Sequence, residues 1–144
     1  MGSLNSKEAA EMFGLTADTI RYYERVGVIP PIKRDKNGYR VYTTRDLNWI
    51  YLAKSLRHAG VSIESLIEFA TLAQLEGNVE QAQKQILQDQ LQEINEKLGE
   101  MTKTRDLLQY KIDTYDEHIA KFKSGEITTD NLEELWKVKY DNQK

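Results

Sequence analysis

The sequence predicts a mainly α-helical protein, in which a small N-terminal domain of four helices and a β-hairpin precedes a long coiled-coil helix and a short C-terminal helix. Three observations lead to this fold class. Glycines separate short amphipathic segments in the first half of the chain, the pair Asn37-Gly38 lies between two β-prone runs, and an apolar heptad repeat fills the second half. The domain boundaries that follow are 1–76, 77–124 and 125–144.

Two short helices joined by a glycine turn are predicted at the N-terminus. Ser6 can cap a helix of residues 7–13, which Gly14 can end in the left-handed conformation. Thr16 can cap a second helix of about nine residues, closed by Gly27. This is the spacing of a helix-turn-helix, although helical hairpins with a glycine turn also occur in proteins that never bind DNA.

A β-hairpin is predicted after the second helix. Pro30-Pro31 prevents the helix from continuing, and Asn37-Gly38 between two short runs is a strong hairpin signal. The predicted strands, 32–34 and 39–42, suit a wing that lies along a phosphate backbone, because basic and aromatic side chains alternate through this segment. They are Lys33, Arg34, Lys36, Tyr39, Arg40 and Tyr42.

Two more helices complete the predicted N-terminal domain. Thr43 and Asp46 form a capping-box-like start for a third helix, which Gly60 stops. Ser62 caps a fourth helix, which ends near Gly77. A domain of this size can bury one hydrophobic core.

The second half of the chain carries a strict heptad repeat over a helix from about residue 79 to residue 123, roughly 65 Å long. One helix cannot bury so narrow an apolar stripe, so the pattern predicts that this helix packs against a partner helix. Arg105 either occupies a polar core position that fixes the register or extends its side chain outward. A short helix beginning at Thr129 or Asp130 is predicted to follow. The seam residues, here called the α-seam, are Leu87, Leu91, Ile94, Leu98, Met101, Leu108, Ile112, Tyr115, Ile119 and Phe122.

Charge and composition restrict the function. The net charge is −3, yet residues 21–57 hold nine Lys/Arg against three Asp/Glu, as a phosphate backbone would require. The sequence contains no cysteine, which excludes disulfides and thiolate metal sites. His58 and His118 lie too far apart in the sequence for a shared metal site to be expected. No apolar run approaches the roughly 20 residues of a membrane span, which favours a cytoplasmic protein. Neither a catalytic constellation nor a cofactor motif is present, so no enzymatic activity, cofactor or metal is predicted.

The N-terminal part of the sequence resembles the MerR family of bacterial transcriptional regulators. The resemblance spans residues 4 to about 72 and rests on residues 16–24 (TADTIRYYE), 27–31 (GVIPP), 38–42 (GYRVY), 46–47 (DL) and 56–63 (LRHAGVSI). It implies a winged helix-turn-helix and an antiparallel dimerisation helix. It also implies a homodimer on a palindromic promoter, which bends and untwists an overlong spacer so that RNA polymerase engages both promoter elements.

The resemblance also implies roles for individual residues. Arg21 would reach a base edge or a phosphate, and one of Tyr22 and Tyr23 would touch the backbone while the other packs in the core, because adjacent helical positions cannot both face a groove. The remaining predicted DNA contacts come from the recognition helix, the wing and the third helix. They are Thr16, Thr19, Lys36, Tyr39, Arg40, Lys54 and Arg57.

The effector is the least determined part of this prediction. The chain resembles most the short family members that respond to aldehydes or nitrosative stress, but Ser55 stands where several of those carry a cysteine, and serine has no accessible thiolate. Trp136 and Tyr140, with Leu132 and Leu135, either cover an apolar effector pocket or simply hold the terminal helix down. Two alternative functions stay open: an effector-independent, excisionase-like DNA-bending protein, and a coiled-coil protein-interaction module.

Overall fold

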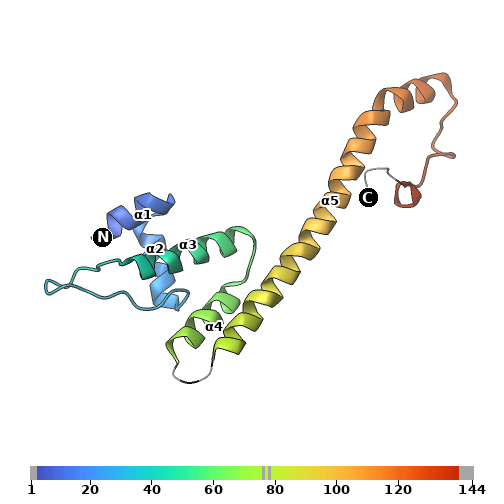
Figure 1. Cartoon of the computed structure of the whole chain (residues 1–144). Coiled ribbons are helices and arrows are strands. Elements are labelled where there is room, and N and C mark those ends of the chain that lie inside the picture. The colour runs from blue at the N-terminus through green and yellow to red at the C-terminus, as the bar shows by residue number, and fades with distance from the viewer. Residues whose placement is uncertain (1–2, 76, 78, 140–144) are drawn as a thin grey trace. The chain divides into compact units, whose positions relative to one another are not determined.

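The computed structural model describes residues 3–75, 77 and 79–139, and the chain forms two compact units, Met1–Leu91 and Gln92–Lys144 (Figure 1). The fold is mainly α-helical, as predicted. The elements in chain order are α1 (Ser6–Phe13), α2 (Ala17–Val26), α3 (Thr44–His58), α4 (Ile63–Gln74), α5 (Glu80–Ser124) and a 3₁₀ turn, η1 (Leu135–Lys137).

The helix-turn-helix forms from α1 and α2 as the sequence predicts, with one difference at its start. Asn5, not Ser6, caps α1: the Asn5 side chain accepts from the Glu8 backbone N–H at 2.8 Å, and the Glu8 carboxylate accepts from the Asn5 N–H at 3.0 Å. Thr16 caps α2 by accepting from the Thr19 N–H, and Gly27 ends α2 with φ of 92°. Only glycine adopts that conformation without strain.

The prediction of a β-hairpin wing is wrong. Within the described residues the segment after α2 forms only two isolated antiparallel bridges, Arg34–Arg40 and Leu4–Tyr42. A two-residue type I′ turn requires a positive φ at both Asn37 and Gly38, and only Gly38 has one.

The pairing of the two arms does not extend past Lys33 and Val41, because each arm then has a partner elsewhere. Tyr42 exchanges backbone hydrogen bonds with Leu4, ahead of α1, at 2.8 and 3.0 Å. The Ile32 backbone N–H donates to the Glu24 carboxylate in α2 at 2.9 Å. Near the turn, the Val41 N–H still donates to the Lys33 carbonyl at 2.9 Å. Residues 33–41 are therefore a basic loop, here called the wing loop, rather than a pair of strands.

The two helices that follow begin where their capping residues predict. Thr43 and Asp46 form a complete capping box at the start of α3, and the Ser62 hydroxyl accepts from the Ser65 N–H at the start of α4. One hydrophobic core joins α1 to α4 with residues that flank the wing loop on either side. Its buried members are Ala9, Ala10, Ile20, Tyr23, Val28, Ile29, Ile32, Tyr42, Leu47, Ile50, Ala53, Val61 and Leu66.

The first turns of α5 run antiparallel to α4 within the same unit (Figure 1). Gln83 donates from its side chain to the Phe69 carbonyl, and Gln90 donates to the Ser65 hydroxyl, each at 3.4 Å. The rings of Trp49 in α3 and Phe69 lie 5.5 Å apart. The first turns of α5 are thus bonded to α4 by two glutamines that the sequence analysis did not single out.

The second unit holds the rest of α5 and a tail in which the predicted α-helix does not form. Among its described residues the tail is helical only in the 3₁₀ turn η1. The Asn131 side chain accepts from the Thr128 backbone N–H at 2.6 Å and so caps a tight local turn, which competes with helix formation. Glu133 is held against α5, accepting from the Tyr110 hydroxyl at 2.5 Å.

The α-seam is largely exposed in the single chain. Met101 and Ile112 are each 69% exposed, and Leu98 and Leu108 are exposed as well. None of the helices in the described part of the chain combines the length and apolar character that crossing a bilayer requires.

Candidate nucleic-acid interface

Helix α2 presents one face to the core and another to solvent. Ile20 is fully buried, and Tyr23 is 9% exposed. Tyr22 lies outside, where the guanidinium of Arg25 stacks over its ring at 5.4 Å from the centroid. Within the tyrosine pair, the core position therefore belongs to Tyr23 and the surface position to Tyr22.

The hydroxyls of Thr16 and Thr19 lie close together at the start of α2. Their oxygens are 2.9 Å apart, and Thr16 also accepts from the Thr19 backbone N–H. Further along the helix, the Arg21 guanidinium pairs with Asp18. These side chains put hydroxyl and guanidinium donors on the exposed surface of the predicted recognition helix.

Arg40 in the wing loop is anchored to α2 by a carboxylate that sequence reasoning missed. The Arg40 Nε–H donates to Glu24 Oε1 at 2.7 Å, and the second Glu24 oxygen accepts from the Ile32 N–H. The pair is mostly enclosed, with side-chain exposures of 21% for Arg40 and 16% for Glu24. Glu24 therefore sets the position of the wing loop relative to the recognition helix.

All three carboxylates in the basic segment 21–57 accept hydrogen bonds from backbone N–H groups. Glu24 accepts from the Ile32 N–H, Asp35 accepts from the Asn37 and Tyr39 N–H groups, and Asp46 accepts from the Thr43 N–H. Each carboxylate thus fixes a backbone bend in the surface that carries the arginines. An isolated acidic residue within a basic run was the sequence signal that could have identified Glu24.

We expect Glu24→Ala to weaken DNA binding about 5- to 10-fold, although it removes a negative charge from a basic surface. Long-range attraction alone would strengthen binding, but loss of the anchor frees Arg40 and the wing loop, and breaking an enclosed ion pair is destabilising. Titration of a DNA duplex measures the affinity, and urea unfolding measures the stability. Glu11→Ala, which removes an exposed carboxylate of α1, is the matched control. Binding by Glu24→Ala as tight as that of Glu11→Ala would contradict the anchoring role.

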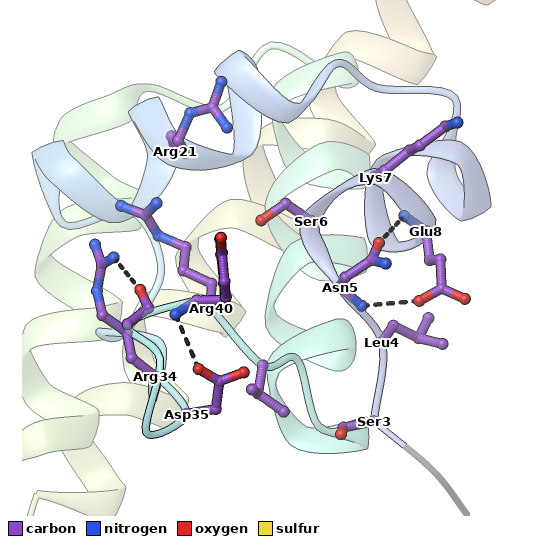
Figure 2. Close-up of a pocket in the computed structure, with 13 residues that line it drawn as sticks. Ser3, Leu4, Asn5, Ser6, Lys7, Glu8, Arg21, Arg34, Asp35 and Arg40 are labelled. Carbon is purple, nitrogen blue, oxygen red and sulfur yellow. Dashed lines mark hydrogen bonds between the residues drawn. The ribbon is translucent and has the colours of Figure 1, made fainter.

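The surface between α1, α2 and the wing loop contains a hollow of about 660 Å³ (Figure 2). Arg21, Arg34, Tyr39 and Arg40 are among the residues that line it. Arg21 and Arg40 also line an adjoining hollow of about 590 Å³ with Arg25. Tyr39 is 72% exposed, and Lys36 is exposed at the turn of the wing loop. The structure therefore gathers predicted DNA contacts from α2 and the wing loop onto one surface.

The side chains of two predicted DNA contacts on α3 donate hydrogen bonds to backbone carbonyls of the protein. The Lys54 ammonium donates to the Phe13 carbonyl at the end of α1 at 2.5 Å, and Arg57 Nη1 donates to the Val61 carbonyl at 2.6 Å. Both side chains satisfy carbonyls at or near helix ends, which have no partner within a helix. Their contact with phosphate stays a prediction.

The predicted effector residues belong to different parts of the chain: Ser55 lies in the first unit and Trp136 in the second. Ser55 is exposed on α3, Trp136 is 81% exposed in η1, and Tyr140 lies outside the described residues. The second unit does contain a pocket of about 510 Å³, lined by Leu132, Leu135 and residues of α5 but not by Trp136. In the described part of the chain, no cluster of His, Asp and Glu could hold a metal ion.

Comparison with known proteins identifies the family. Residues 4–71 match the family described as "MerR HTH family regulatory protein". The HTH-type transcriptional regulator AdhR of Bacillus subtilis (strain 168) is 48% identical over 93 residues, which cover 65% of this chain and 66% of AdhR. A MerR family transcriptional regulator of Listeria monocytogenes, of known structure, is 41% identical with a TM-score of 0.77, covering 85% of this chain and 93% of its own. The chain belongs to the MerR family.

A further solved structure connects this fold to DNA. HiNmlR, a MerR family regulator lacking the sensor domain and bound to promoter DNA, is 28% identical with a TM-score of 0.73, and the match covers 82% of this chain and 94% of HiNmlR. The chain is accordingly a MerR-type DNA-binding transcriptional regulator, and the prediction of that function is confirmed. MerR proteins are transcriptional regulators rather than enzymes, in agreement with the sequence analysis.

Proposed function

We propose that this MerR regulator acts as a homodimer on a palindromic promoter and distorts an overlong spacer, so that RNA polymerase can engage both promoter elements. The observation that carries the proposal is the exposed α-seam on the same chain as a basic helix-turn-helix surface. Two copies joined along the seam would present two such surfaces to one duplex. Half-site spacing would then mirror the symmetry of the dimer.

The exposed side chains of α5 support pairing with a second copy. Leu91, Leu98 and Leu108 are 56–59% exposed in the single chain. Full burial of an exposed leucine side chain stabilises a structure by about 1.5–3 kcal/mol. The α-seam repeats such positions along most of a 45-residue helix. A helix with a seam of this kind is stabilised by a partner helix that offers the same pattern.

Distortion of the spacer follows from two separated binding surfaces on one dimer. Bending a site of 20–30 base pairs costs on the order of 1–6 kcal/mol. Contacts between phosphates and the arginines of α2 and the wing loop can offset this cost. The energy of bending is thus within the range that the proposed interface supplies.

The test uses a duplex that the full-length protein has selected from a random pool. We expect mobility-shift titrations to show tight binding with a steep salt dependence, and footprinting to show symmetric protection centred in the spacer of a matching promoter. Protection without promoter symmetry would favour the excisionase-like alternative. Weak binding with a flat salt dependence would favour the protein-interaction module.

The effector stays a prediction within this proposal. Ser55, Trp136 and Tyr140 are its candidate residues, and a small molecule acting through them would change how the dimer holds its promoter.

A further inference from the structure

The tail that follows α5 lies back along the last turns of that helix. Among its described residues, 125–139, the Ile127 backbone N–H donates to the Lys121 carbonyl at 3.1 Å. The pocket of about 510 Å³ lies between this tail and α5, and apolar side chains from both segments line it. They are Tyr115, Ile119 and Phe122 of α5 and Ile127, Leu132 and Leu135 of the tail. We call this pocket the tail groove.

The helix wall of the tail groove is the end of the α-seam. Tyr115, Ile119 and Phe122 are the last three seam residues, and all three are exposed in the single chain. Leu132 on the tail wall is exposed as well. The two walls therefore form an open apolar surface, which is stabilised when further apolar side chains remove it from water.

Polar contacts hold the tail wall against α5 within the single chain. Glu133 accepts from the Tyr110 hydroxyl at 2.5 Å, and its second carboxylate oxygen lies 3.8 Å from Nδ1 of His118. The Asn131 side chain accepts from the Thr128 backbone N–H and fixes the turn that leads into this wall. The groove is thus formed before any partner arrives, and preorganisation of this kind lowers the cost of binding.

The position of the groove determines what reaches it. Because its helix wall is the α-seam, a helix that pairs with the seam passes along the open side of the groove. The seam of α5 carries leucine and isoleucine side chains such as Leu91 and Ile94, and such side chains insert as knobs into holes on a facing helix. The Glu133 and Asn131 side chains at the groove are already bonded within the chain, so apolar contact dominates what the groove offers.

We propose that the tail is part of the subunit interface, and that the tail groove receives α-seam side chains from α5 of a second copy of this chain. The inference rests on the proposed function and deepens it, because it assigns the tail a role in holding two copies together. The tail forms an additional wall around the partner helix. It thereby adds apolar area to the interface beyond the pair of facing helices.

The first test compares Leu132→Ser with Trp136→Ser, which removes an exposed apolar side chain of the tail that does not line the groove. We expect Leu132→Ser to raise the dissociation constant of the dimer about 10- to 100-fold, because each dimer would have two grooves and each would lose a leucine contact. Trp136→Ser should stay within about 2-fold of the parent. Sedimentation equilibrium over a dilution series measures the constant, and circular dichroism checks that both variants keep their helices. Equal dissociation constants for the two variants would overturn the proposal.

The second test identifies what touches the groove. Because the chain contains no cysteine, Leu132→Cys provides a single attachment point for a photoreactive benzophenone. After subunit exchange with ¹⁵N-labelled parent, mass spectrometry should find the probe joined to heavy peptides of α5. A probe that reacts only with its own light chain would overturn the proposal and leave the groove open to a small-molecule ligand. A parent that sediments as a monomer at micromolar concentration would instead refute the proposed function.

Discussion

Two glutamates in the α-seam should convert the proposed homodimer to monomers and remove most of its affinity for DNA. We expect Met101→Glu with Leu108→Glu to abolish dimerisation at micromolar concentration, because each copy would bury unpaired carboxylates against the other. In a dimer, binding of one helix-turn-helix unit raises the effective concentration of the second unit at its half-site. A monomer loses this advantage, so affinity for a duplex with two half-sites should fall about 100-fold or more. Binding to a single half-site should change little.

Sedimentation velocity and mobility-shift titration measure the two effects on the same samples. Asn95→Glu with Thr102→Glu is the matched control, because both are exposed polar positions that directly follow seam residues. The control should stay dimeric and bind as the parent does. A parent that sediments as a monomer, or a dimeric seam variant, would remove the basis of the proposed function.

The parts of the fold that the sequence predicted correctly are those set by local chemistry. Thr16 and Thr43 cap helices through side-chain bonds to residues three positions along, and Gly27 ends α2 within its own turn. The heptad period of α5 is also a local repeat, and the helix extends from Glu80 to Ser124 where 79 to 123 was expected. Such features require no knowledge of the tertiary structure.

The parts that were missed depend on contacts between distant residues. The wing loop lacks a hairpin because Tyr42 pairs with Leu4 and the Ile32 N–H turns to Glu24, and neither partner is visible in the local pattern. Glu24 and Arg40 are 16 positions apart, so their ion pair could not be read from spacing. The predicted terminal helix does not form for a local reason, because Asn131 and Thr128 favour a turn capped by the Asn131 side chain over helix continuation.

In the candidate interface, acidic residues hold basic ones in place, and this arrangement determines which substitutions should change DNA binding. Asp18 and Glu24 reduce the net charge of the surface, yet they hold Arg21 and Arg40 in place. A surface optimised only for attraction to DNA would lack them. Affinity for phosphate should therefore depend more on the direction of the guanidinium groups than on total charge.

Arg21→Ala with Arg40→Ala should then have the largest effect on DNA binding of any pair that leaves the proposed dimer intact. Each dimer would lose two arginines from each of two heads, and at roughly 1–3 kcal/mol for each arginine we expect affinity to fall at least about 1,000-fold. The control Arg45→Ala with Lys84→Ala removes the same charge from exposed positions of the N-terminal unit and should cost much less.

The salt dependence of the single variants separates the roles of the two arginines. If Arg40 binds only phosphate, Arg40→Ala should weaken the selected and mixed-sequence duplexes equally and lower the salt slope. If Arg21 also reaches a base edge, Arg21→Ala should weaken the selected duplex more and so reduce specificity. Because Arg40 is anchored by Glu24, whereas Arg21 pairs with the exposed Asp18, Arg40→Ala alone should also lower the urea midpoint. A double variant that holds the selected duplex as firmly as the parent would show that α2 and the wing loop do not form the interface.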